Sequence, residues 1–254
     1  MVKFLIIVPT LNSYKLLPKL IRSLETQTFQ NWKLIFVDGN SNTQHKKFLQ
    51  SICKENKKFE IINQSKKSKG IYGAMNDGIK ISKKSDWILF WGSDDWANNK
   101  NILSDLNEII HGFSEIPDLI ISEAAYYNKK LQKTRISKFR YLINFRFSLF
   151  MGSSPPHQGT IFSPNVIKKI NFFNENISLS ADLDYFLNLS KFNNLKIHLL
   201  KKNIVSMGDG GISGLETKKR FYQVIQCYKK RYGFLMPIPF IMRYAGRFLD
   251  LINK

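Results

Sequence analysis

The sequence predicts an α/β fold in which a mixed, mostly parallel sheet carries helices on both faces. Two observations support this prediction. Short, fully apolar runs recur through the first half of the chain, as expected of strands that are buried on both faces. Segments with helical spacing separate these runs, and strands that alternate with helices form parallel sheets.

Apolar runs mark five strands of the predicted sheet. The first, residues 4–8, reads Phe-Leu-Ile-Ile-Val and contains no polar residue. Three further runs, residues 34–37, 87–91 and 119–121, are also apolar throughout, and residues 59–62, which include Glu60, are a weaker strand. Another short strand is expected at residues 159–162. Most of these strands should lie side by side in one sheet.

Amphipathic segments follow the strands. In residues 16–24 the apolar side chains form one stripe, and Ser13 is the expected N-cap. The same spacing predicts helices at residues 48–52, 73–82, 99–111 and 181–191. Near the C-terminus, a helix with an apolar face ends at Gly233, its expected C-cap. Pro237 and Pro239 should then interrupt the chain before an apolar tail of residues 240–252.

The composition narrows the possible partners. The formal charge of +20 favours an anionic partner, namely nucleic acid, a phosphate-rich ligand or an anionic membrane surface. A lysine-rich source is the alternative explanation. Cys53 and Cys227 lie far apart, which is typical of free thiols in a reducing compartment. We find neither a signal peptide nor an apolar stretch of about 18 residues, so we expect a cytoplasmic protein.

Polar clusters follow three predicted strands, at residues 9–12, 38–41 and 93–95. Ligands of open parallel sheets bind beyond the carboxyl ends of the strands, so we expect one site there. The third cluster contains two adjacent carboxylates, Asp94 and Asp95, which repel each other unless a cation or ribose hydroxyls lie between them. Mg²⁺ or Mn²⁺ fits best, because either ion bridges carboxylates to substrate phosphates. A solvated turn is the alternative.

Lys69 and Gly70 precede the predicted helix, which should begin near Tyr72. A lysine beside a helix N-terminus is suited to a diphosphate. A solvated lysine in the basic run of residues 66–69 is equally compatible with the sequence.

Five motifs, taken in order, resemble those of family 2 glycosyltransferases, the GT-A enzymes of bacterial polysaccharide and lipopolysaccharide synthesis. They are "IIVPTLN", "VDGNS", "KGIYGAMNDGI", "WGSDDW" and "SADLDYFLNL". The resemblance extends from residue 1 to about residue 215. It implies a GT-A fold, a nucleotide-sugar donor and a divalent metal, Mn²⁺ or Mg²⁺.

The resemblance also implies roles for the polar clusters. Asp95 would hold the metal on the diphosphate of the donor, and Asp94 would contact the ribose or the metal. Thr10 and Asp38 would hold the base and the ribose, with Asn12 beside them in the first cluster. An aspartate that accepts from a uracil or guanine N–H is chemically reasonable.

A second acidic pair, Asp182 and Asp184, lies on the predicted helix of residues 181–191. By resemblance Asp182 is the general base, which takes a proton from the acceptor hydroxyl. Two residues apart on a helix, the two side chains do not share a face, and Asp184 is the alternative base. His157 matches a histidine near the acceptor end, where it would orient a donor phosphate or an acceptor hydroxyl. A structural histidine fits equally well.

The chain departs from the family pattern at three positions. Gly39 and Gly73 stand where aspartate is common, and Ala181 stands where glutamate is common. These differences bear on which base is bound and on one contact to the donor sugar. Residues 208–213 resemble a loop that closes over the nucleotide.

The expected function is that of a metal-dependent, inverting hexosyltransferase. It would move a sugar from a nucleotide-diphospho-sugar to a hydroxyl of a lipid-linked glycan in O-antigen, capsule or exopolysaccharide synthesis. A UDP-sugar is favoured over a GDP- or dTDP-sugar. We expect a GT-A domain of residues 1–215, with a donor half of about 1–123 and an acceptor half of about 124–215. Residues 216–254 would form a C-terminal amphipathic helical region.

Two functions without catalysis remain open, because residues 135–150 mix basic and aromatic side chains. Nucleic-acid binding would use stacking and phosphate contacts, but it leaves the acids at the strand ends unexplained. We therefore expect no nucleic-acid partner. Binding to an anionic membrane is the other function. In the enzyme hypothesis, the same segment and the C-terminal tail place the protein peripherally on the inner face of the cytoplasmic membrane.

Overall fold

The computed structural model describes residues 2–170, 172–208 and 216–252, with the backbone alone described for residues 247–252. Its strands are β1 (Lys3–Thr10), β2 (Trp32–Asp38), β3 (Phe59–Asn63), β4 (Asp86–Phe90), β5 (Asp95–Ala97), β6 (Leu119–Tyr127), β7 (Lys133–Ser137), β8 (Thr160–Phe162) and β9 (Ile197–Met207). Its helices are α1 (Leu17–Glu25), α2 (Thr43–Glu55), α3 (Gly70–Lys80), α4 (Ile102–His111), α5 (Phe145–Phe150), α6 (Pro164–Lys169), α7 (Ala181–Leu189), α9 (Thr217–Tyr232), the 3-10 turn η1 (Gly233–Leu235) and α10 (Pro237–Ile252).

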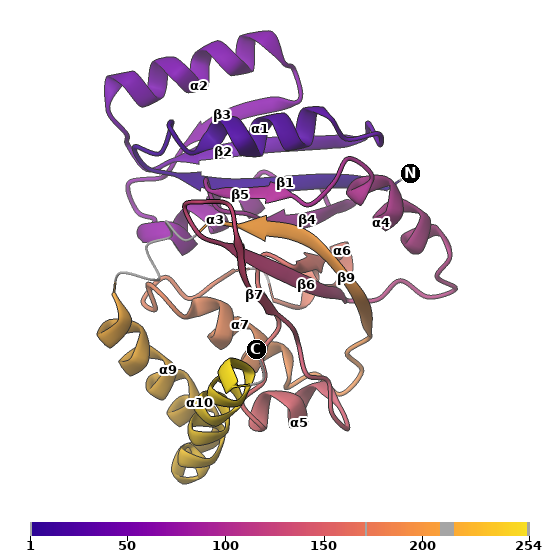
Figure 1. Ribbon diagram of the computed structural model, residues 1–254, viewed down its shortest axis with the longest axis vertical. Coiled ribbons are helices and arrows are strands. Elements are labelled where there is room, and N and C mark those ends of the chain that lie inside the picture. Colours follow the sequence, from indigo (N-terminus) through magenta and orange to yellow (C-terminus); the bar gives the residue numbers. More distant parts are fainter. Residues whose placement is uncertain (1, 171, 209–215, 253–254) are drawn as a thin grey trace.

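The strands form one mixed sheet in the order β3-β2-β1-β4-β8-β6-β9-β5, with β7 paired to β6 (Figure 1). The first four strands in this order are parallel, as the sequence predicted. Beyond β4, strand β8 runs antiparallel to both of its neighbours. The carboxyl ends of β1, β2 and β4 therefore lie at one edge of the sheet.

Helices cover both faces of the sheet, and each face has its own core. Alternate residues of β1 point to opposite faces, so Ile6 packs in the core with α1, α2 and α4, whereas Ile7 packs in the core with α3 and α7. Gly78 lets α3 approach β1 closely, because a Cβ at this position would lie 2.5 Å from a methyl carbon of Ile7. The predicted α/β fold with helices on both faces is confirmed.

The structure corrects several predicted details. Ser13 does not cap α1, whose N-cap is Leu16 without a side-chain hydrogen bond. Pro237 and Pro239 do not interrupt a helix but occupy the first turn of α10, where no backbone N–H donor is needed. The sequence interpretation also missed β5, β7, β9, α5 and α6. No helix in the described ranges combines the length and the apolarity needed to cross a bilayer.

Candidate active site

The ends of β1 and β2 bring the first two polar clusters together. Thr10 and Asp38 are paired in the parallel register, and the Gly39 N–H donates to the Thr10 carbonyl over 2.8 Å. Asn12 joins the loops that follow, because its N–H donates to Ser41 Oγ over 2.8 Å. Its backbone φ of 52° is left-handed, a conformation that asparagine tolerates. The loops therefore form one connected rim, as predicted.

A buried histidine that the sequence interpretation overlooked lies under this rim. His45 is fully buried on α2, and its Nε2 lies 3.6 Å from Asp38 Oδ1, too far for a hydrogen bond. Thr10 Oγ1, Asp38 Oδ1 and both His45 nitrogens have no hydrogen-bond partner among the described residues. Burial lowers the pKa of His45, and the Asp38 charge opposes this shift only in part. Buried polar atoms left without partners point to a ligand site.

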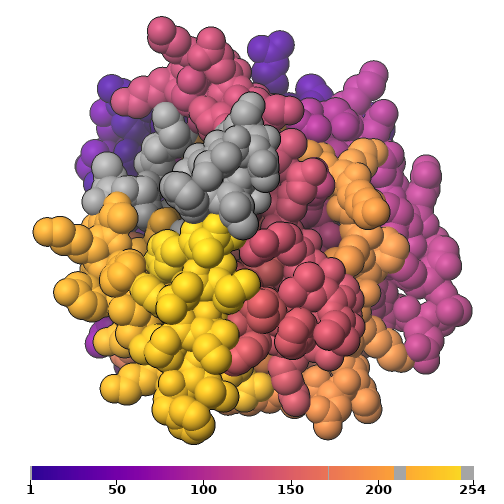
Figure 2. Space-filling view, turned by 60° about the horizontal axis from the view of Figure 1, so that its bottom comes forward, coloured from indigo at the N-terminus to yellow at the C-terminus, as the bar shows by residue number. Residues whose placement is uncertain are grey.

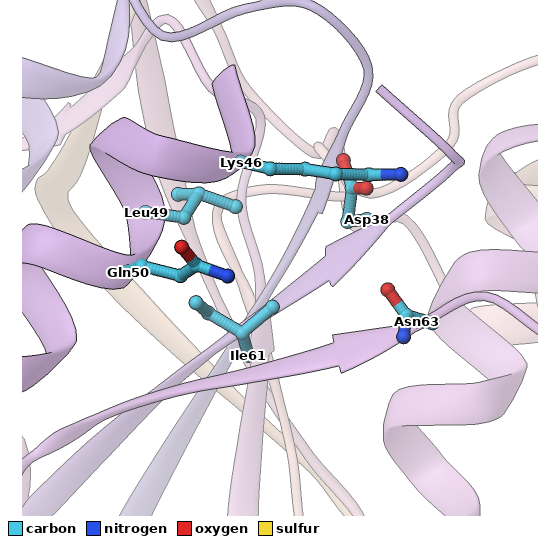
Figure 3. A pocket seen from close by; sticks show the side chains of 6 residues that line it. All are labelled: Asp38, Lys46, Leu49, Gln50, Ile61 and Asn63. Carbon is cyan, nitrogen blue, oxygen red and sulfur yellow. The ribbon is translucent and has the colours of Figure 1, made fainter. Parts of the chain in front are cut away.

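A pocket of about 320 Å³ opens beside Asp38. Figure 3 shows its wall, in which α2 contributes Lys46, Leu49 and Gln50 while the neighbouring strands contribute Asp38, Ile61 and Asn63. Carboxylate, ammonium and amide groups thus surround a small space with an apolar floor. Such a lining can both donate hydrogen bonds to a flat polar ring and accept hydrogen bonds from it.

The acidic pair follows β4 and is tied to the same rim. Ser93 Oγ donates to the Pro9 carbonyl over 3.2 Å and lies 2.8 Å from Ser13 Oγ. Asp95 is only 2% exposed, and the Gly92 N–H donates to its carboxylate over 2.5 Å. Burial, together with the nearby Asp94 charge, raises the pKa of Asp95 to about 8. A buried carboxylate with this pKa is stabilised as an anion by a cation.

The donor set of this pair fits a divalent metal that is shared with a phosphate ligand. Gly92 leaves room around it, since a Cβ there would lie 3.1 Å from an oxygen of Asp94. A Cβ at Gly208 would come still closer, at 2.9 Å from the same carboxylate. Within the described ranges, no three acidic, histidine or cysteine side chains converge. Asp94 and Asp95 would therefore hold Mn²⁺ or Mg²⁺ with phosphate and water completing the coordination.

The second acidic pair points in two directions. Asp182 Oδ1 accepts a hydrogen bond of 3.1 Å from the Tyr72 hydroxyl on α3. Burial and the Asp182 charge raise the pKa of Tyr72 far above its usual value, so this hydroxyl remains a donor. Asp184 is instead buried against α9, whose Lys230 Nζ lies 3.1 Å from it, and Asn188 of its own helix donates to it over 3.2 Å. The geometry thus separates the two candidate bases.

His157 lies in an aromatic cage next to Asp182. Its ring stacks on Phe90, the last residue of β4, at 5.4 Å, and Phe162, Phe173 and Phe186 pack around it. Burial lowers the pKa of His157 to about 4, although the Asp182 charge acts in the opposite direction. The imidazole is therefore neutral near pH 7. Its Nε2 has no hydrogen-bond partner in the part of the chain that the structure describes.

Lys69 is the N-cap of α3, at the helix N-terminus as predicted, and its side chain is exposed. The backbone N–H of Lys69 donates to Glu175 over 2.7 Å, so a carboxylate that the sequence interpretation missed already lies at this helix end. Gly73 is required by packing, because a Cβ there would lie 2.9 Å from the Ser68 carbonyl carbon. Of the predicted loop of residues 208–213, all but Gly208 lies outside the described residues.

The site residues form two groups beside the end of β4. Thr10, Asn12, Asp38, Asp94 and Asp95 belong to a hydrogen-bonded rim. The other group contains Asp182, Tyr72 and His157, and it joins the rim through the contact of His157 with Phe90. This sheet, with an acidic pair after the strand beside β1, is the fold of GT-A glycosyltransferases.

Solved structures support the assignment of this fold. TarS of Staphylococcus aureus, residues 1–349 in complex with UDP-GlcNAc, is similar with a TM-score of 0.69 and 20% identity over 89% of this chain. The chain spans 65% of that TarS chain. The mannosyltransferase PcManGT of Pyrobaculum calidifontis, solved with GDP-Man and Mn²⁺, is similar with a TM-score of 0.63 and 11% identity. That match covers 95% of this chain and 69% of PcManGT.

The chain belongs to glycosyl transferase family 2, whose model matches residues 5–165. It is 26% identical to the PGL/p-HBAD biosynthesis glycosyltransferase of Mycobacterium tuberculosis, over 95% of this chain and 90% of that protein. A stretch of 95 residues is 30% identical to the GalNAc(5)-diNAcBac-PP-undecaprenol beta-1,3-glucosyltransferase of Campylobacter jejuni. This stretch is 37% of the chain and 30% of that enzyme. The protein is therefore a glycosyltransferase, as its motifs indicated.

Proposed function

We propose that the protein is an inverting hexosyltransferase that moves a sugar from a nucleotide-diphospho-sugar to a hydroxyl of a lipid-linked glycan. The observation that carries the proposal is the connected rim, in which the Asp94-Asp95 pair adjoins the buried, unpartnered oxygens of Thr10 and Asp38. A carboxylate pair suits a metal-bound diphosphate, and the oxygens suit a base and a ribose. We assign the donor half to about residues 1–123 and the acceptor half to about residues 124–215.

In this proposal Asp95 and Asp94 hold the divalent ion, which supplies Lewis-acid stabilisation of the diphosphate leaving group. Thr10 and Asp38 position the base, and Asp38 accepts from its N–H. A UDP-sugar is the favoured donor, and the TarS complex with UDP-GlcNAc supports this choice. A GDP-sugar is the second choice, because PcManGT binds GDP-Man with Mn²⁺. Asn12 shapes the rim, while Lys69 and His157 are proposed contacts to the donor.

Asp182 acts as the general base in the proposed reaction. The acceptor hydroxyl gives its proton to Asp182 while its oxygen attacks the anomeric carbon. The bond between that carbon and the diphosphate oxygen breaks, and the nucleoside diphosphate departs with the electron pair. One displacement inverts the anomeric configuration. Asp184 cannot serve in the same way, because it faces α9 and is paired with Lys230.

The acceptor is proposed to be a lipid-linked glycan of a surface polysaccharide. The similarity to the GalNAc(5)-diNAcBac-PP-undecaprenol beta-1,3-glucosyltransferase of Campylobacter jejuni supports this class of acceptor. An enzyme with such an acceptor works at a membrane surface. We therefore place the protein peripherally on the inner face of the cytoplasmic membrane.

A thermal-stability screen of nucleotide-sugars with Mn²⁺ tests the proposal. A ligand at a hundred times its Kd stabilises a fold by about 2.7 kcal/mol, which gives a clear rise in Tm. We expect UDP-sugars, or else GDP-sugars, to raise Tm with Mn²⁺ present, and we expect Asp95→Ala to abolish the rise. Tight, salt-sensitive binding to oligonucleotides without any nucleotide-sugar response would favour the nucleic-acid function instead.

A further inference from the structure

A solvent-exposed apolar stripe runs along α10. Ile238 and Ile241 are 42% and 61% exposed, Ala245 is also exposed, and Phe234 just before the helix is 90% exposed. Their spacing of three and four residues places them on one side of the helix. Single exposed apolar residues are common, but a continuous stripe marks an interaction site.

The opposite side of α10 is fixed on the protein. A Cβ at Gly246 would lie 2.3 Å from the Arg140 guanidinium, and a Cβ at Gly152 would lie 2.2 Å from the backbone of Arg243. The Phe240 ring packs on Phe221 at 4.9 Å. Figure 2 shows α10, in yellow, lying next to the rose-coloured segment that contains α5. The stripe is thus presented by a docked helix.

The surface around the stripe is strongly basic. Residues 138–150, which lead into and include α5 beside α10, contain three lysines and arginines and no acid. Residues 216–246 contain another seven, with Glu216 as the single acid. Lys138, Lys219 and Lys230 pair with carboxylates, and most of the basic side chains in the two segments are exposed. We call these two segments the docking face.

We infer that the docking face binds an anionic lipid bilayer, with the α10 stripe inserted and the lysines and arginines at the headgroups. Aliphatic side chains suit acyl chains, and basic side chains suit anionic headgroups. A second copy of the chain fits poorly, because it would bring the same positive charge against this face. Nucleic acid also fits poorly, because aliphatic Ile238, Ile241 and Ala245 make up most of the stripe and Phe234 is its one aromatic ring for stacking.

The docking face is coupled directly to the proposed catalytic base. The Leu179 N–H donates to Gln223 on α9 over 2.8 Å, and Cys227 Sγ lies 3.7 Å from the Ser180 carbonyl. These contacts hold α9 against the start of α7, which carries Asp182. A bilayer bound here would bring a lipid-linked acceptor to the side of the site where Asp182 lies. The lipid-linked part of this inference rests on the proposed function.

Sedimentation with lipid vesicles tests the inference. We expect the protein to bind vesicles that contain phosphatidylglycerol and to bind pure phosphatidylcholine vesicles much more weakly. Ile238→Gln combined with Ile241→Gln should lower binding about tenfold or more, because each change removes buried CH₂ groups. Lys218→Gln combined with Lys229→Gln, two exposed lysines of α9, should lower it about tenfold, mainly at low salt. Ile116→Gln, which changes a 48% exposed residue outside the docking face, is the matched control.

Three results would overturn the inference: equal binding to both kinds of vesicle, full binding by the isoleucine double variant, or a dimer in light scattering that this variant abolishes. The last result would identify a second copy as the occupant. Nucleotide binding in solution should be unchanged in the isoleucine variant. If vesicles bind as expected while nucleotide-sugars do not bind, the proposed function fails and the docking face stands.

A separate observation concerns His45. The structure assigns His45 as the residue that positions Asp38 to accept a hydrogen bond from an N–H of the base. Asp38 Oδ2 accepts from the Ser41 N–H over 3.1 Å, which fixes one oxygen. The other oxygen faces His45 Nε2 at 3.6 Å. A small shift on ligand binding would bring these two atoms into hydrogen-bond range, and the Tyr14 ring packs against the imidazole at 6.4 Å.

Base discrimination tests this assignment, which rests on the proposed role of Asp38. The probes are UDP and its N3-methyl derivative, which lacks the N–H. We expect the wild-type protein to prefer UDP, and His45→Phe to lower that preference about tenfold. His45→Gln, which keeps a donor, should restore part of the preference. Affinity for pyrophosphate with Mn²⁺ should not change.

Two results would contradict the assignment of His45. One is an unchanged preference in His45→Phe. The other is an equal loss of affinity for UDP and pyrophosphate, which would indicate a purely structural role. If the wild-type protein and Asp38→Asn both lack a preference, then the proposed role of Asp38 fails together with the assignment.

Discussion

The two acidic pairs of the molecule contain the same residue type and have opposite environments. Asp94 and Asp95 are adjacent after a strand, and each carboxylate raises the cost of charging the other. Asp182 and Asp184 are two residues apart on α7, and each has a separate partner, Tyr72 or Lys230. In the first pair, a bound cation would stabilise the ionised form of the buried Asp95. In the second pair, Asp182 lies in the site, whereas Asp184 pairs with Lys230 and so holds α7 against α9.

The strongest test of this division is to neutralise each member of the second pair. We expect Asp182→Asn to lower kcat for donor turnover by about 10²–10⁴-fold, the usual contribution of a general base. Nucleotide affinity should be nearly unchanged. Asp184→Asn is the matched control and should keep most of the activity. If Asp184→Asn alone abolished turnover, the assignment of the base would be wrong.

The neutral imidazole beside Asp182 gives a pH-dependent test. Burial holds the pKa of His157 at about 4, against about 6.5 in an unfolded chain. Between these values the unfolded chain binds more protons, so the stabilisation is complete above pH 6.5 and is lost as the pH falls toward 4. The loss amounts to about 3 kcal/mol.

Urea denaturation from pH 7 to pH 4 measures this effect. His157→Phe, which suits the aromatic cage, should flatten the pH dependence relative to the wild-type protein. His45 is present in both proteins, so its own contribution cancels in the difference. Equal pH slopes in the two proteins would show that His157 does not stay neutral.

A smaller effect is expected from the hydroxyl that orients the base. Tyr72→Phe removes the hydrogen bond to Asp182 and preserves the packing of the ring. A hydrogen bond to a charged group contributes about 1.5–3 kcal/mol, so kcat should fall about 10–100-fold. Steady-state kinetics should show little change in KM for the donor. An unchanged kcat would remove Tyr72 from the site.

The smallest expected effect is on the structural member of the pair. Lys230→Met leaves Asp184 buried, with Asn188 still donating to it. Lys230 is half exposed, so the cost is limited to about 1 kcal/mol of unfolding free energy. Chemical denaturation measures this cost, and kcat should stay within about twofold of the wild-type value. A large loss of activity at full stability would contradict the division of roles.

The parts of the fold that the sequence predicted are those in which a local pattern decides the structure. Strands β1, β2 and β4 are buried on both faces and therefore read as apolar runs. Strand β9 was missed because Lys201 and Lys202 are exposed in its middle, where the pairing register with β6 also shifts. Strand β7 was missed because its residues are almost all exposed.

In the candidate site, too, only features set by a local sequence pattern could be predicted. The three rim clusters could be predicted because the ends of parallel strands must meet. The roles of His45, Glu175 and Tyr72 depend on contacts between elements far apart in sequence, which no local pattern reveals. Ser13 was wrongly predicted as a helix cap because serine caps many helices, whereas here its hydroxyl contacts Ser93. The choice between Asp182 and Asp184 required knowing which face of α7 meets α9.

The central claim is that the Asp94-Asp95 pair binds a nucleoside diphosphate through a divalent metal. Calorimetric titration of UDP and of GDP, each with and without Mn²⁺, into the wild-type protein and Asp95→Asn tests it most directly. We predict that Mn²⁺ strengthens binding of one nucleotide about tenfold or more in the wild-type protein, and that Asp95→Asn removes this gain. Equal affinity with and without Mn²⁺ in both proteins would contradict the claim.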